Sequence, residues 1–241
     1  MPQTILNEVQ EFCEEMLLPI PGAVVSSADP NVRQIRALLL RAGNSLALRG
    51  EWSRLTHEEV HTTVAQEDQG SIYDITASGA TAFRKIKNET FWDRTDKLPV
   101  CPINPIDWQL VKATISAQPR YRYRLVRGRL LFTPTPPAGH SVAFEWISKW
   151  WIQDSVGTIK ERFTQDTDTF LLERELLKLG LTWRWKKAKG FDYTEEYEEY
   201  ETRLSETLGH DVTRETVYMD QYQRQAKPGL FVPEYSWDLS S

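Results

Sequence analysis

Cysteine and histidine are scarce in this chain of 241 residues, which has two cysteines and four histidines. Two thiols as far apart in the sequence as Cys13 and Cys101 cannot form a disulfide framework, which favours a reducing cytoplasm as the place of synthesis. The sequence also contains no phosphate-binding glycine loop, no G-x-S-x-G nucleophile elbow and no C-x-x-C pair. Because these common catalytic motifs are missing, we do not expect an enzyme.

Long apolar runs and an excess of positive charge are missing as well. No uninterrupted apolar run approaches the roughly 20 residues that a membrane-spanning helix needs. The segment Met1–Gly22 has no basic start and is acidic through its middle, so we expect no signal peptide. The net charge of −5 argues against a chain that binds nucleic acid mainly through its overall charge. We therefore expect a soluble protein that binds no membrane.

The strongest pattern in the sequence lies in Phe170–Leu208, which predicts two amphipathic helices. The link between them, Lys189–Asp192, is so short that the two helices should run antiparallel. Gly190 suits a left-handed helix end, and Asp192 with Glu195 matches a capping box for the second helix. Lysines on the first helix and glutamates on the second are expected to pair across the hairpin. The apolar stripes are Leu172, Leu176, Leu179 and Trp183 on the first helix, and Tyr193, Tyr197, Tyr200, Leu204 and Leu208 on the second.

Two further helices and a β-rich region precede this hairpin. Apolar residues at helical spacing predict helices over Thr4–Leu17 and Asn31–Arg49. Beyond Leu55, β-branched residues and alternating apolar residues predict strands, among them Ile72–Ile75 and Phe83–Phe91. Three more elements are expected: a short helix near Pro105–Ala113, a β-hairpin that turns at Arg127 and Gly128, and a strand that begins near Val142.

These elements predict an α+β fold class, in which an antiparallel helical bundle is interrupted by a β-rich insertion and followed by an extended C-terminal tail. We expect the bundle in residues 1–54 and 164–209, the insertion in 55–163 and the tail in 210–241. The tail carries aromatic residues without periodicity, and we interpret them as anchors on another protein surface. These candidate anchors are Tyr218, Tyr222, Phe231, Tyr235 and Trp237.

The segment His57–His61 matches the H-E-x-x-H pattern of zinc proteases. That chemistry needs both imidazoles on one helical face, with a glutamate beside them as the base. However, Thr62, Thr63 and Val64 favour a strand, which would keep His57 and His61 well apart. We therefore expect a solvated strand or loop here, and a zinc-dependent hydrolase is the alternative function.

Two other polar groups are weaker candidates for a site. Asp166 and Asp168 could belong to a carboxylate metal site, but we expect one of them to cap the helix that follows. The predicted β-hairpin has arginines on the face opposite its aromatic residues, and such a face can contact DNA phosphates or another subunit. We favour a solvated or subunit-contacting face over DNA. The arginines are Arg120, Arg122, Arg124, Arg127 and Arg129.

Several motifs together resemble the head-to-tail adaptor, or tail accessory factor, proteins of tailed bacteriophages. They are FWDRTDKLP at Phe91–Pro99, the Asn104-Pro105 and Asp107-Trp108 pairs, the stretches Tyr123–Leu131 and Val142–Ile147, and above all Phe163–Tyr200 with its D-x-D-T and L-G-L-x-W-R-W sequences. The resemblance covers about Asp29–Leu208.

The resemblance implies a structural protein of the virion neck, which assembles in the host cytoplasm as a ring of twelve subunits. Such a ring docks beneath the portal protein, extends the DNA ejection channel, and offers a platform for tail nozzle, tube or fibre proteins. Genomic DNA passes through it without sequence-specific contacts, and the C-terminal segment often runs along the portal. The family has no catalytic motif, metal or cofactor to transfer to this chain.

Overall fold

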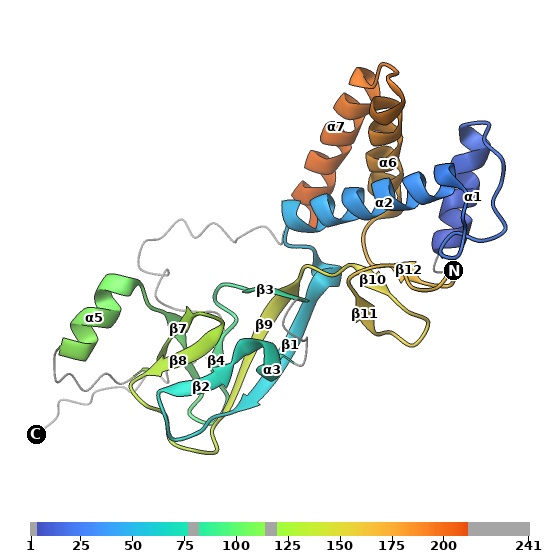
Figure 1. Cartoon of the computed structure of the whole chain (residues 1–241). Coiled ribbons are helices and arrows are strands. Elements are labelled where there is room, and N and C mark those ends of the chain that lie inside the picture. The colour runs from blue at the N-terminus through green and yellow to red at the C-terminus, as the bar shows by residue number, and fades with distance from the viewer. Residues whose placement is uncertain (1–3, 77–81, 114–119, 212–241) are drawn as a thin grey trace, which may run out of the picture.

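A computed structural model of the chain describes residues 4–76, 82–113 and 120–211, and the side chains of all of these except residues 210 and 211 (Figure 1). The described helices are α1 (Ile5–Glu15), α2 (Pro30–Arg49), α3 (Ile72–Ile75), α5 (Pro105–Ala113), α6 (Arg174–Lys189) and α7 (Thr194–Asp211), with a 3-10 turn at Ser53–Leu55. Among the described helices, none is both long and apolar enough to cross a membrane.

The described strands form three sheets. The first sheet contains β1 (Thr56–Thr62), β9 (Ser141–Ser148), β4 (Trp92–Asp93) and β5 (Leu98–Pro99) in that order, and β3 (Phe83–Ile86) also pairs with β9. The second contains β2 (Asp68–Ser71), β8 (Arg129–Thr133), β7 (Arg122–Val126) and β6 (Cys101–Pro102) in that order. The third has β11 (Ile159–Lys160), β10 (Ile152–Gln153) and β12 (Thr169–Phe170) in that order.

The predicted fold class, an antiparallel helical bundle with a β-rich insertion, is wrong. The described residues form a mixed α/β structure with three antiparallel or mixed sheets, in which the parallel pair is β6 with β7. The sheets hold a hydrophobic core of their own, so they are more than an insertion into a bundle. Figure 1 also shows α2 lying across α6 instead of alongside it. Only α6 and α7 form the antiparallel pair that the sequence predicts.

Two hydrophobic cores organise the molecule. One lies among the helices, where Leu39, Leu176 and Tyr200 are buried together with Trp151 and Phe163 from the β-rich stretch. The other lies between the first two sheets, and its largest buried side chains include Phe91, Phe132, Phe144 and Trp146. Strand β9 contributes to both cores, because Ile147 faces the helices while Phe144 and Trp146 face the second sheet.

The helical hairpin is confirmed. Helix α6 ends at Gly190, whose left-handed backbone (φ 80°) lets the N–H of Phe191 reach the carbonyl of Lys186 at 2.9 Å. Asp192 then accepts a hydrogen bond from the backbone N–H of Thr194 at 3.0 Å, where α7 begins. The predicted helices near Thr4–Leu17 and Asn31–Arg49 are also confirmed, as α1 and α2.

Charge pairing across the hairpin is only partly as predicted. Lys186 pairs with Glu196 of α7, but Lys178 pairs with Glu15 of α1. The amino group of Lys189 lies over the ring of Trp185, at 4.3 Å from its centroid. These three lysines of α6 therefore contact α7, α1 and α6 itself, instead of α7 alone.

The strand predicted at Ile72–Ile75 is wrong, because this segment is the short helix α3. The hydroxyl of Thr76 donates to the carbonyl of Ile72 at 2.8 Å and closes the turn. The strand predicted over Phe83–Phe91 exists but ends at Ile86, before Glu89 adopts a left-handed conformation. The first error arises because a run of apolar residues this short does not distinguish a strand from a single helical turn. The second arises because the chain turns at Glu89, which the alternating pattern does not reveal.

Arg84 fastens the sheets to the helices. Its guanidinium group donates to the carbonyls of Ala47, Leu48 and Gly50, at distances between 2.8 and 3.0 Å. These carbonyls lie at the C-terminal end of α2, where the helix leaves its last acceptors without intrahelical donors. A side chain from β3 therefore caps a helix whose own core lies in the other half of the molecule.

Candidate interaction surfaces

The arginine hairpin forms as predicted, but its charge is partly neutralised. Arg122 and Arg124 lie on β7 on the face opposite Tyr123, whose side chain is buried in the core between the sheets. Arg129 shares their face and forms an ion pair with Asp68 of β2, with 2.5 Å between Nε and Oδ2. Arg120 is exposed before β7, and Arg127 is exposed in the turn. The hairpin thus presents a mixed face in place of a row of free cations.

The candidate anchors of the C-terminal tail lie outside the described residues. They are Tyr218, Tyr222, Phe231, Tyr235 and Trp237.

The H-E-x-x-H segment is strand β1, as the β-branched residues after it favour. His57 and His61 are therefore separated by about 13 Å along the strand, too far to bind one metal ion together. His57 instead stacks on Trp146 of β9, with 4.8 Å between ring centroids. Burial lowers the pKa of both histidines and raises the pKa of Glu59 between them. The segment forms a half-buried polar stripe on the edge of the sheet.

A carboxylate–imidazole cluster that the sequence analysis missed lies at the other side of β9. The ligand atoms of Asp93, Asp96 and His140 lie within 4.8 Å of one another, and this is the only such group in the described part of the chain. The carboxylate of Asp93 is fully buried and accepts hydrogen bonds from the N–H groups of Thr95 (2.8 Å) and Asp96 (3.1 Å). Nδ1 of His140 lies 3.0 Å from its other oxygen, and this contact raises the pKa of His140. Asp93 therefore fixes the turn between β4 and β5 to the start of β9.

Asp166 and Asp168 both cap backbone, but neither caps the helix that follows, so that prediction is wrong. Asp166 accepts from the N–H groups of Val24 and Val25, at 3.0 and 2.7 Å, and so holds the linker between α1 and α2. Asp168 is buried, accepts from the N–H groups of Thr164 and Gln165, and pairs with Lys160 at 3.0 Å. The sequence could not reveal the partners of Asp166, because they lie about 140 residues away along the chain.

Helix α2 carries a positive outer face. The helix contains four arginines and no acidic residue. Arg49 forms a two-pronged ion pair with Glu201 of α7, and Arg36 donates to the carbonyl of Val25 at 2.6 Å. Arg33 and Arg41 are exposed, and neither has an ion-pair partner among the residues that the structure describes. Two full positive charges therefore remain available on this face.

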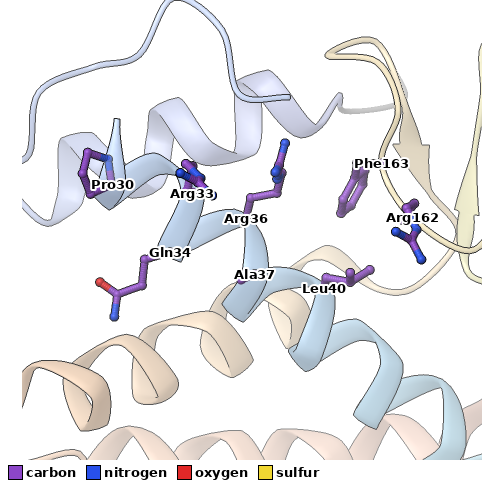
Figure 2. A pocket seen from close by; sticks show the side chains of 8 residues that line it. All are labelled: Pro30, Arg33, Gln34, Arg36, Ala37, Leu40, Arg162 and Phe163. Carbon is purple, nitrogen blue, oxygen red and sulfur yellow. The ribbon is translucent and has the colours of Figure 1, made fainter. Parts of the chain in front are cut away.

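The N-terminal half of this face borders a hollow of about 670 Å³, shown in Figure 2. Arg33 and Arg36 come from α2, and Arg162 comes from the loop between β11 and β12. Leu40 and the buried Phe163 supply apolar surface between these guanidinium groups. The hollow therefore combines cationic edges with an apolar floor, which suits an acidic protein surface with some apolar content.

Helix α7 carries the opposite charge on its outer face. Glu195, Glu198 and Glu199 are exposed, and none of them has an ion-pair partner in the described part of the chain. Glu206 continues the same stripe and contacts only the neighbouring Arg203, at 3.5 Å. Tyr197 lies on the opposite side of α7, where its ring meets Trp183 of α6 at 5.3 Å between centroids. The chain thus has one basic and one acidic helical face, on two helices that both pack on α6.

Comparison with known proteins gives no family assignment for this chain. No family model matches it, and no characterised protein matches it. The function of the chain is therefore inferred from its own residues and contacts, together with the resemblance in its motifs.

Proposed function

We propose that this chain is a structural virion protein, a subunit of a ring-forming head-to-tail adaptor. The observation that carries the proposal is the role of the polar residues in the motifs that resemble this family. Asp93, Asp166 and Asp168 are the most prominent acidic residues of these motifs, and each accepts two backbone N–H groups. Residues that serve as internal fasteners suit a protein whose task is to hold a shape.

The aromatic residues of the L-G-L-x-W-R-W motif support the same proposal. Trp185 is buried in the helical core and meets Phe12 of α1 edge to face, at 5.9 Å between ring centroids. Trp183 lies against the tyrosines of α7, with the ring of Tyr197 at 5.3 Å between centroids. The guanidinium of Arg184 lies over the Trp183 ring, 4.1 Å from its centroid. The hairpin is thereby bound to α1 on one side and closed by α7 on the other, as a rigid wall requires.

In this proposal the subunits form a ring of twelve copies, which docks under the portal protein and extends the channel for genomic DNA. Its other side offers the attachment platform for tail components, and the protein belongs to the neck of the virion. The aromatic residues of the tail, Tyr218–Trp237, bind the portal. Fixing the tail in one conformation on the portal costs conformational entropy, and the aromatic contacts with the portal must offset this cost.

The proposal is tested with portal-bearing capsids that lack this protein. Purified full-length protein should add to the capsid vertex as a ring that electron microscopy resolves. A protein that leaves the vertex bare at micromolar concentration would contradict the adaptor function.

Deletion of Arg214–Ser241 separates the role of the tail from that of the folded part. We expect the shortened protein to keep the circular dichroism spectrum and melting behaviour of the full chain but to lose binding to the capsids. The matched control is full-length protein with Tyr235→Ala and Trp237→Ala, which should weaken binding without removing the segment. A shortened protein that binds with full strength would show that the tail is not an anchor.

A further inference from the structure

We infer that the outer face of α2 in one copy binds the outer face of α7 in a second copy, through arginine–glutamate contacts. This inference rests on the proposed ring-forming function and names the surfaces that would join neighbouring subunits.

The α2 face is a continuous stripe. Arg33, Ala37, Leu40, Arg41 and Leu48 fall within about 100° of one another around the helix axis, so they lie on one side of the helix. Leu48 is 56% exposed, and a second hollow of about 440 Å³ lies between Leu40 and Leu48. The face therefore alternates two arginines with apolar surface, a mixture that suits a protein-binding surface.

The α7 face matches it in charge and in length. Arg33 and Arg41 are eight residues apart, about 12 Å along the helix axis. The acidic stripe from Glu195 to Glu206 is about 16 Å long and so covers this span. Tyr197 lies on the opposite side of α7, against Trp183 of α6, so the contact with α2 depends on the glutamates. Opposite charges placed at matching spacing fix the register of two helices as well as attracting them.

The remaining charges of the helical region explain why these faces are left for a second copy. Arg174 pairs with Glu8 and Glu11 of α1. Of the lysines on α6, Lys178 pairs with Glu15 and Lys186 pairs with Glu196. These pairs join the helices of one chain to one another. Arg33 and Arg41 take no part in them, and neither do Glu195, Glu198 and Glu199.

The contact is heterologous, because α2 and α7 are different surfaces of the same chain. Each copy therefore uses α2 toward one neighbour and α7 toward the other, and a repeated contact of this kind closes into a ring when the rotation permits it. Nucleic acid is a competing ligand for α2, but it would leave the acidic face of α7 without a partner. A second copy uses both faces at once.

Charge reversal tests the inference. The variants are R33E/R41E, E198R/E199R and the chain that carries all four changes; Glu198 and Glu199 lie outside the first turn of α7, where acidic residues stabilise the helix itself. The control K97E/K149E alters the net charge as much as R33E/R41E does, but on two exposed lysines that flank strands of the first sheet. Circular dichroism and melting curves check that every variant folds.

Self-association is measured by sedimentation velocity, and ring formation on portal-bearing capsids is measured by electron microscopy. We expect each reversed variant to associate at least tenfold more weakly than the native chain, and the fourfold variant and an equimolar mixture of the two reversed variants to recover. The control should associate like the native chain.

Three results would overturn the inference. The first is native-like association of R33E/R41E, and the second is a fourfold variant that stays as weak as the single-face variants. The third is an R33E/R41E protein that loses only DNA binding in a mobility-shift assay, which would make α2 a nucleic-acid surface. In each of these cases the native ring persists and the proposed function stands, whereas a native chain that forms no ring in solution or on capsids contradicts both.

Discussion

Replacement of Gly43 by alanine tests how tightly α2 packs on the rest of the helical core. Gly43 is buried in the middle of α2, and the indole of Trp151 lies directly against its backbone. A methyl group at this position would lie within 3.0 Å of three ring atoms, closer than carbon atoms approach in proteins. Either the indole or the helix must therefore move.

The indole cannot move cheaply. Its Nε1 donates to Oδ1 of Asn44 at 2.8 Å, and its ring meets Phe163 edge to face at 5.5 Å between centroids. Overpacking of a well-filled core costs about 1–3 kcal/mol, and we expect the upper end here. Alanine gains about 1 kcal/mol over glycine in helix propensity. The net expectation for Gly43→Ala is a loss of about 2 kcal/mol, or a melting temperature lower by about 4–8 °C for a chain of this size.

The assay is urea unfolding followed by tryptophan fluorescence, with Gly209→Ala as the matched control. Gly209 is also helical, but a methyl group there would meet nothing within 4 Å, so alanine should stabilise by up to about 1 kcal/mol. The double variant with Trp151→Phe should lose less than the sum of the two single changes, because a smaller ring leaves room for the methyl group. A Gly43→Ala protein as stable as Gly209→Ala would refute the close packing.

Two further predictions concern a contact that joins the two halves of the molecule and a contact within the first sheet. Arg84→Met keeps the aliphatic stem but removes three hydrogen bonds to the end of α2, so it should cost about 2 kcal/mol in urea unfolding, whereas the exposed Arg162→Met should cost less than about 0.5 kcal/mol. The hydrogen bond that His140 donates to Asp93 raises the pKa of His140 above 6.5, so its stabilising effect is complete below about pH 6.5 and is lost as the pH rises through the folded-state value. The difference in unfolding free energy between native protein and His140→Gln should therefore shrink from pH 6 to pH 9. Burial lowers the pKa of His57 and His61, which acts in the opposite direction in both proteins and so cancels in this difference. An unchanged difference over this range would contradict the His140–Asp93 contact.

The sequence predicts local elements well where their signals are local. Helix α6 and its end at Gly190 follow from the spacing of apolar residues and from one glycine, both of which are visible within a few turns of the chain. The β-hairpin at Arg127 and Gly128 follows in the same way. The strand character of β1 follows from the β-branched residues after it, and it removes the zinc-protease reading of His57 and His61.

The error in fold class has a physical cause. Six of the strands have only two residues each, which is too short for any alternation of apolar and polar side chains. They are β4, β5, β6, β10, β11 and β12. Their existence depends on partners distant in the sequence, as β4 depends on β9 about 50 residues away. A helix of 20 residues such as α2 has an apolar periodicity that can be recognised in the sequence, whereas strands of two residues have none. The sequence pattern therefore indicates the helices more strongly than the sheets, although the sheets form a core of their own.

The site residues that the sequence missed share this non-local character. Arg33 and Arg41 are unremarkable in the sequence. They matter because the other two arginines of α2 are held within the chain, Arg49 by Glu201 and Arg36 by the carbonyl of Val25, while these two are not. Gly43 and Arg84 likewise acquire their roles only when Trp151 and the end of α2 are brought to them.

Strand β9 makes the helical half and the sheet half depend on each other. It pairs with β1, β3 and β4, and the chain then continues through Ile147 into Trp151, whose indole packs on Gly43 of α2. Arg84 of β3 binds the carbonyls at the C-terminal end of the same helix. A force on α2 is therefore transmitted to the sheets at two points along the helix. If α2 binds a neighbouring subunit, as inferred above, the sheets would be held in fixed orientation around the ring, which is what a platform for further components needs.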